Sequence, residues 1–150
     1  MNIDKKQLYL ICQSQVSDKI LEIKKSIDSA RESSKNDTKS SMGDKYETTR
    51  EMLQQEINML EKQLSEANHQ QYNLSTINPE KLIESIESGS LIYTNAGIFF
   101  IAVSIGEILL NGDKIFVISP VSPLGKLLLG KKQEQSISIN NKEIKILKVI

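Results

Sequence analysis

Two carboxylates, Asp44 and Glu47, stand three positions apart in a short polar stretch of the sequence. Residues with this separation lie on the same face of a helix, so both side chains can point toward one ligand. Carboxylate oxygens bind hard divalent cations such as Mg²⁺, but two carboxylates alone bind such an ion weakly. The pair would therefore complete a metal site whose remaining ligands come from a partner.

A purely structural role for the same two residues stays open. Asp is favoured at the start of a helix, and a Glu three positions later has the spacing of a capping box. Acidic side chains in a first helical turn also complement the helix dipole. The spacing of Asp44 and Glu47 is compatible with both helix capping and metal binding, and it does not distinguish between these roles.

Basic residues surround the acidic pair, namely Lys35, Lys39, Lys45 and Arg50. They would attract a phosphate backbone that comes near, although a solvated helix face of mixed charge is the simpler interpretation. His69 has neither a second His nor a Cys partner with which to bind a metal. We therefore expect His69 on the surface of the protein.

Two stretches with heptad spacing predict the helices that position the acidic pair. Steps of four and three separate the apolar residues of each stretch, which are Val16, Ile20, Ile23, Ile27 and Ala30 in the first and Leu53, Ile57, Leu60, Leu64 and Ala67 in the second. Two such narrow apolar stripes must be buried against each other. We expect an antiparallel coiled-coil hairpin over residues 1–75.

Antiparallel pairing also locates the turn of this hairpin. The residue numbers of facing positions have a nearly constant sum, from the pair Ala30 and Leu53 to the pair Val16 and Ala67. This sum places the turn at about residue 42 and the tip near residues 42–47, with Gly43 supplying the backbone freedom of a reversal. The acidic pair would lie at the end of a rod with arms of roughly 45 Å. Polar residues that compete with helical hydrogen bonds predict that the first arm frays over 32–43.

Composition and charge exclude several classes of protein. The chain has 150 residues with 19 basic and 19 acidic side chains, so no net charge draws it to nucleic acid or to an anionic membrane. The single cysteine, Cys12, excludes an internal disulfide, and we expect it to be a small buried side chain. The apolar run 98–110 is shorter than the roughly 20 residues of a membrane span. These features favour a cytoplasmic protein without a membrane partner.

The range 76–150 predicts a small domain, which makes the fold class α+β. Runs rich in β-branched and aromatic residues alternate with turn residues and predict five strands, over 90–95, 98–105, 114–119, 135–139 and 143–150. The pair Asn140-Asn141 marks a hairpin turn. Ser122, Pro123 and Gly130 can cap, start and end one short helix, and a second short helix is expected over 79–89.

This domain offers no nucleophile with a plausible His base, no Gly-rich phosphate loop and no cluster of metal ligands. We therefore expect no active site of its own and no small-molecule substrate.

Two segments carry a resemblance to a known family. They are Ile118-Ser-Pro-Val-Ser-Pro-Leu-Gly-Lys-Leu-Leu-Leu-Gly-Lys-Lys132, followed by the two closing strands, and Gly43-Asp44-Lys45-Tyr46-Glu47. Together with the predicted hairpin they resemble the bacterial transcript-cleavage factors GreA and GreB, which are transcription elongation factors. The first segment is similar to the family's Ser-Pro, small-helix and Gly-Lys segment, and the second to its Gly-Asp-x-x-Glu tip. The resemblance covers most of 89–150 and the tip, and elsewhere it is one of architecture.

The resemblance implies a coiled-coil hairpin followed by an FKBP-like domain that docks on RNA polymerase. It implies that the hairpin enters the secondary channel of the polymerase, where the tip carboxylates help to hold a Mg²⁺ ion for cleavage of backtracked RNA. On this resemblance Asp44 and Glu47 assist catalysis in trans as metal ligands, and Lys45 with its basic neighbours lies near the RNA 3′ end. The polymerase remains the enzyme, and this chain stimulates its endonucleolytic activity.

The sequence also departs from the family pattern. Thr48 replaces the usual Asn, the next Glu-Tyr is missing as though a few residues had been deleted, and Glu134-Gln135 replaces a Gly-Asp. These departures keep open a Gre-like regulator that occupies the channel without promoting cleavage. Two further classes remain as alternatives: a prolyl isomerase, for which the domain has few aromatic residues, and a chaperone-like hairpin that clasps unfolded proteins.

Overall fold

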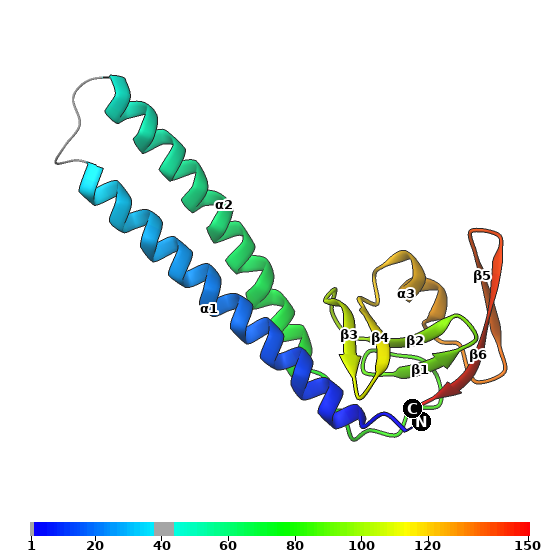
Figure 1. Cartoon of the computed structure of the whole chain (residues 1–150). Coiled ribbons are helices and arrows are strands. Elements are labelled where there is room, and N and C mark those ends of the chain that lie inside the picture. Colours follow the sequence, from blue (N-terminus) through cyan, green and yellow to red (C-terminus); the bar gives the residue numbers. More distant parts are fainter. Residues whose placement is uncertain (1, 38–43) are drawn as a thin grey trace. The chain divides into compact units, whose positions relative to one another are not determined.

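The computed structural model describes residues 2–37 and 44–150, with the backbone alone for residues 36, 37 and 44–46. By its internal contacts the chain divides into two compact units (Figure 1). The hairpin unit is Ser14–Gln71, and the sheet unit is Met1–Gln13 together with Tyr72–Ile150. The sheet unit thus includes the first residues of the first helix and the last residues of the second, which the sequence analysis placed in the range 1–75.

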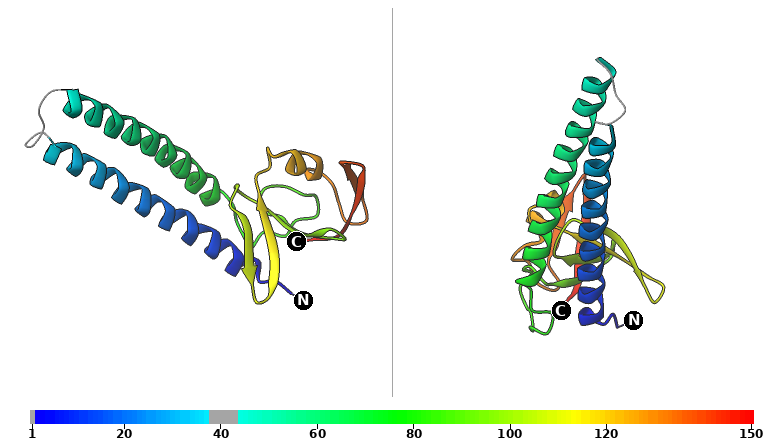
Figure 2. Two further views of the ribbon diagram at one scale, coloured as in Figure 1. Left: turned by 45° about the horizontal axis from the view of Figure 1, so that its top comes forward. Right: turned by 90° about the vertical axis from the view of Figure 1, so that its left-hand side faces the viewer.

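Two long helices, α1 over Lys5–Asp37 and α2 over Asp44–Ser75, form the hairpin (Figures 1 and 2). Two hydrogen bonds show that they are antiparallel. The Arg31 guanidinium donates to the Glu61 carboxylate at 3.1 Å, and the Gln71 side-chain amide donates to the Ser17 hydroxyl at 3.4 Å. The earlier residue of α1 is thus paired with the later residue of α2. All five apolar residues of the α1 stripe are buried. From the α2 stripe Ile57 and Ala67 are buried, and Leu53, Leu60 and Leu64 are half-buried. The predicted antiparallel helical hairpin is confirmed.

The first helix continues further than the sequence analysis expected. It includes Glu32–Asp37, so the predicted fraying is wrong for these residues. Ser and Asn each lower helix propensity by at most about 0.7 kcal/mol relative to Ala, and no Gly or Pro interrupts this stretch. The expected apex, Met42 and Gly43, lies outside the described residues.

A six-stranded sheet with the order β3-β4-β2-β1-β6-β5 forms the body of the sheet unit. The strands are β1 Leu91–Thr94, β2 Gly97–Ile101, β3 Gly106–Leu110, β4 Asp113–Ile118, β5 Ser136–Ile139 and β6 Lys142–Val149. Neighbouring strands are antiparallel except for β2 and β4, which are parallel. The register of this parallel pair sets Phe99 beside Phe116, with ring centroids 5.8 Å apart.

The short helix α3, over Pro123–Leu128, contributes to the core of this unit. Leu128 belongs to a buried apolar cluster with Ile86, Ile92, Phe99, Ile101, Ile137, Ile144 and Ile146. Burial of each such side chain contributes about 1.5 to 3 kcal/mol to folding. The cluster joins α3 to strands β1, β2, β5 and β6, and the α+β fold class predicted from the sequence is confirmed.

The ends of α3 are those that the sequence predicted. Ser122 caps the helix, because its hydroxyl accepts a hydrogen bond from the Gly125 amide at 3.0 Å. Pro123 is the first helical residue. Gly130 follows the C-cap residue Leu129. Its φ of 80° is the left-handed conformation that ends many helices.

Strand β3 was missed by the sequence analysis, which expected five strands. It pairs with β4 through a two-residue turn in which Asn111 has a φ of 53° and Gly112 a φ of 86°. An Asn-Gly pair with both φ values positive is typical of a tight hairpin turn, so this dipeptide was the overlooked signal. The predicted turn at Asn140 and Asn141 is confirmed, with φ values of 52° and 63°.

The helix expected over 79–89 does not form. Asn78 instead accepts a hydrogen bond from the Glu80 amide at 3.0 Å in a local turn. Further along, the Ile86 amide donates to the Lys131 carbonyl and the Gly130 amide to the Ile86 carbonyl, both at 2.8 Å. The backbone amide and carbonyl of Ile86 therefore bond to residues distant in the sequence, instead of bonding within a helix.

Hydrogen bonds tie the start of α1 into the sheet unit. The Ile3 amide donates to the Tyr93 hydroxyl at 3.2 Å, and the Lys5 ammonium donates to the Ile150 carbonyl at 2.9 Å. Burial lowers the pKa of Lys5, and the nearby Glu87 carboxylate partly offsets this effect. In the described ranges, 2–37 and 44–150, no helix has the length and apolar character that crossing a membrane requires.

Candidate functional site

The acidic pair lies at the beginning of α2. Asp44 is the first residue of this helix, and Glu47 follows one turn later with an exposed side chain. Positions three residues apart in a helix share a face, so the helix brings the two positions together as the sequence predicted. The backbone of Asp44 is described and its side chain is not, so the predicted capping bond lies outside the described residues.

The donor set at this helix start fits a shared Mg²⁺ site. The ion is commonly held by one or two carboxylates together with waters and phosphate oxygens. The Glu47 carboxylate is exposed and is therefore accessible to a partner. Within the part of the chain that the structure describes, no group of three or more His, Cys, Asp or Glu side chains could hold a metal. Any metal ligands beyond Asp44 and Glu47 would have to come from a partner.

Of the four predicted basic neighbours, two have described side chains. Arg50 is exposed on α2 one turn beyond Glu47, and Lys35 is exposed near the end of α1. Lys45 belongs to α2, but its side chain lies outside the description, and Lys39 lies wholly outside it. The helix thus sets Arg50 on the same face as Glu47, where a cation and a carboxylate can contact different parts of one phosphorylated ligand.

Two other residues that the sequence analysis considered are placed as expected. His69 is exposed on α2. Cys12 is fully buried in α1, and burial raises the pKa of its thiol to about 12. A thiol with such a pKa stays protonated at neutral pH, so Cys12 is not a nucleophile.

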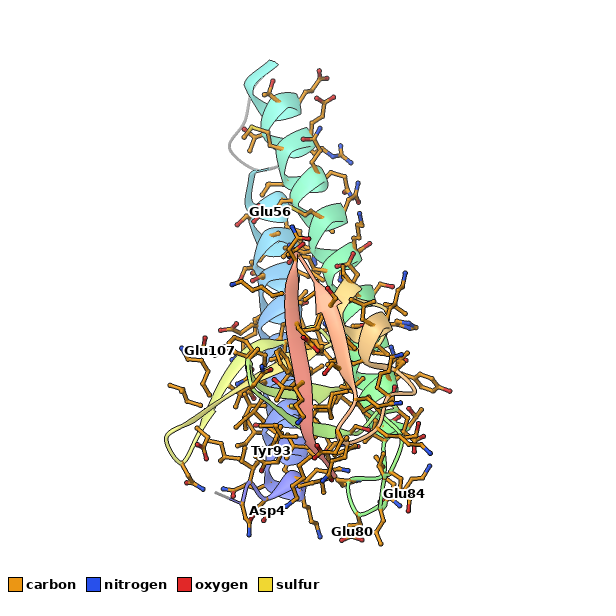
Figure 3. All side chains as sticks on the ribbon, turned by 90° about the vertical axis from the view of Figure 1, so that its right-hand side faces the viewer. Asp4, Glu56, Glu80, Glu84, Tyr93 and Glu107 are labelled. Carbon is orange, nitrogen blue, oxygen red and sulfur yellow. The ribbon has the colours of Figure 1, made fainter. Side chains whose placement is uncertain are left out.

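Two recesses that were not predicted from the sequence lie beside the hairpin seam. One has a volume of about 340 Å³ and is lined by Lys24, Ile27, Asp28, Arg31, Glu61 and Leu64. The other, of about 300 Å³, is lined by Lys25, Ser26, Ser29, Ala30, Ser33, Leu53 and Glu56. Figure 3 labels Glu56, which lies on α2. The available signal was the run of small residues, mostly serines, beside the α1 stripe.

Comparison with known proteins identifies no family for this chain. No family model matches the sequence, and no curated protein matches it. A solved structure described as "Structure of the transcription factor Gfh1" is similar, with 18% sequence identity, a TM-score of 0.38 and coverage of 92% of each chain. At this identity and TM-score, the function has to be argued from the residues of the chain itself.

Proposed function

We propose that this chain is a cytoplasmic transcription elongation factor of the GreA/GreB type, which binds RNA polymerase and stimulates cleavage of backtracked RNA. The hairpin would enter the secondary channel of the polymerase, and the sheet unit would dock on the polymerase surface. One observation carries the proposal: Asp44 and Glu47 begin α2 at the turn end of a helical hairpin, within the segment Gly43-Asp44-Lys45-Tyr46-Glu47.

The length of the helices supports a role as a probe. At 1.5 Å per residue, the 33 residues of α1 and the 32 of α2 each extend for about 50 Å. Ion pairing between the arms, as in Arg31 and Glu61, adds little because both side chains are about half exposed. Burial of the apolar seam therefore supplies most of the stability of the hairpin. The outer surface of the helices stays polar enough to lie in an aqueous channel.

Each residue of the proposed site has a separate role. Asp44 and Glu47 would act as oxygen ligands, with the remaining ligands supplied by the polymerase and the RNA. A Mg²⁺ ion held by these carboxylates would supply a coordinated water of lowered pKa and positive charge beside the phosphate. Lys45 and Arg50 would bind phosphates of the displaced RNA 3′ end and hold it beside the carboxylates. The bond would be broken in the active site of the polymerase, so this chain would be an activator and not itself the enzyme.

A second candidate is a channel regulator that does not promote cleavage. Thr48, where the family pattern has Asn, and the missing Glu-Tyr favour it, because both changes lie within one helical turn of the carboxylates. Such a protein would bind the polymerase at the same place and compete with other channel factors. It would bind equally well after removal of the tip charges.

Site-specific crosslinking tests the placement of the hairpin in either case. A photoreactive group attached to Glu51→Cys, at an exposed position one turn beyond Glu47, should crosslink to RNA or to channel residues in a backtracked complex. Because Cys12 is buried and its thiol protonated, the reagent should label only the introduced cysteine. His69→Cys, exposed toward the other end of α2, is the matched control and should not reach the RNA. Absence of channel and RNA crosslinks from both variants would overturn the proposal.

A further inference from the structure

One side of the hairpin unit combines a depression with two exposed methionines. We call it the serine face, and it consists of the residues around the 300 Å³ recess, which are Lys25, Ser26, Ser29, Ala30, Ser33, Leu53 and Glu56, together with Met52 and Met59. Met52 is 66% exposed and Met59 is 55% exposed. Unbranched methionine side chains adapt to irregular apolar surfaces, and exposed methionines are frequent at binding surfaces.

The two exposed methionines of α2 and two serines of α1 on this face have the same spacing along their helices. Met52 and Met59 are seven residues apart on one face of α2, which is about 10.5 Å along the helix. Ser26 and Ser33 are also seven residues apart on one face of α1, and Ser29 and Ala30 line the recess between them. Because the helices are antiparallel and line the recess together, Met52 lies toward the Ser33 end of this row and Met59 toward the Ser26 end.

We propose that the serine face is the interface of a homodimer, in which α2 of each copy packs on α1 of the other. A two-fold axis parallel to the hairpin brings α2 of one copy opposite α1 of the second copy at the same level. Met52 then contacts the Ser33 end of the recess in the second copy, and Met59 contacts its Ser26 end. The contact is isologous, so each of these contacts occurs twice.

Charge supports a second copy as the occupant of this face. Lys25 on α1 and Glu56 on α2 are both exposed beside the recess. The same two-fold axis brings Lys25 of each copy toward Glu56 of the other, at nearly the same level. Equal numbers of acidic and basic side chains in the whole chain leave no net repulsion between copies.

The size of the face predicts a weak dimer. It involves only about two and a half turns of each helix, and so short a contact buries less than the about 800 Å² per partner of a standard stable interface. Association should therefore appear only at high protein concentration. The two Asp44 helix starts would lie at the same end of the dimer, so the dimer would present two hairpins side by side where the monomer presents one. If the proposed function holds, the dimer would be a form that cannot act on the polymerase.

Sedimentation equilibrium of the full chain without polymerase tests this dimer, so its failure would not bear on the proposed function. Wild-type protein should show a mass that rises from monomer toward dimer as its concentration increases through the micromolar range. The variant with Met52→Lys and Met59→Lys should remain monomeric. Leu21→Lys, at a position 57% exposed and outside the recess lining, is the matched control and should dimerise like wild type.

Two outcomes would overturn the proposal. One is a wild-type protein that stays monomeric at every concentration reached. The other is a double methionine variant that dimerises as strongly as wild type while its circular dichroism shows an intact hairpin.

Discussion

The hydroxyl of Tyr9 in α1 donates a 2.6 Å hydrogen bond to the main-chain carbonyl of Leu74 near the end of α2. Both groups are buried in the sheet unit, and the Gln13 side-chain amide donates to the same hydroxyl at 3.0 Å. The Leu74 carbonyl also accepts a bond from the Ile77 amide, so it keeps a partner when the hydroxyl is removed. This contact joins the two ends of the hairpin helices that belong to the sheet unit.

Tyr9→Phe should lower the free energy of unfolding by about 1 kcal/mol, the net contribution of a typical buried hydrogen bond. Chemical denaturation followed by circular dichroism would measure it. Tyr72→Phe removes a hydroxyl from a side chain that is 66% exposed and should change stability by less than about 0.5 kcal/mol. Equal effects of the two changes would show that the Tyr9 contact adds nothing.

Gly125→Ala should destabilise the sheet unit by about 1 to 3 kcal/mol, through overpacking. A Cβ atom at this position would contact the Ser119 carbonyl oxygen and would lie 2.9 Å from the Ser122 hydroxyl oxygen, which caps α3. Thermal unfolding would measure the change. Lys126→Ala, at the next and exposed position of α3, is the control and should unfold close to wild type. A fully stable Gly125→Ala variant would contradict this account of the α3 start.

The stability of the protein should fall at alkaline pH in part because of Cys12. Its thiol ionises near pH 9.0 when unfolded, whereas burial raises its pKa to about 12 in the folded state. Below pH 9.0 both states hold the proton, and as the pH rises further the unfolded state loses it first. The free energy of unfolding must therefore decrease between these two values.

Cys12→Val removes this titration. The difference in free energy of unfolding between wild type and Cys12→Val should be constant below about pH 9 and then shift against wild type at higher pH. Urea denaturation at a series of pH values would measure the difference. A pH-independent difference would show that the thiol ionises equally easily in both states.

Loss of one proposed metal ligand should change the Mg²⁺ dependence of RNA cleavage. Glu47→Gln keeps the size of the side chain and removes its charge, so half-maximal cleavage should need on the order of tenfold more Mg²⁺. Glu51→Gln removes an exposed charge one turn further along α2 and should leave the dependence unchanged. Identical Mg²⁺ curves for wild type and Glu47→Gln would contradict a ligand role for Glu47.

The hairpin was predictable from sequence because its stabilising contacts follow a local period. Heptad spacing indicated the stripe from Val16 to Ala30 and its antiparallel partner, and both stripes lie where predicted. The short helix at Pro123 was predictable for a similar reason, since Ser122 and Pro123 act on their immediate neighbours. Such signals lie within a few residues of the element that they specify.

The helix expected over 79–89 does not form because distant partners decide the structure there. Ile86 is fixed by backbone bonds to residues 130 and 131, and no local pattern in 79–89 reveals them. Strand β3 was missed although Asn111 and Gly112 marked its turn. For the acidic pair, the spacing of Asp44 and Glu47 predicted a helix start, and α2 does begin at Asp44. Their metal-binding role depends on a partner's ligands, which neither spacing nor the fold of one chain can supply.

The most direct test of the proposed function is transcript cleavage by backtracked RNA polymerase from the same organism. Wild-type protein should shorten the RNA, and the variant with Asp44→Ala and Glu47→Ala should bind the polymerase without doing so. A control with Asp18→Ala and Glu22→Ala removes two exposed carboxylates from α1 away from the turn and should cleave like wild type. Cleavage by the tip variant at the wild-type rate, or no cleavage by wild-type protein that nevertheless competes for the channel, would contradict metal-assisted cleavage at this tip.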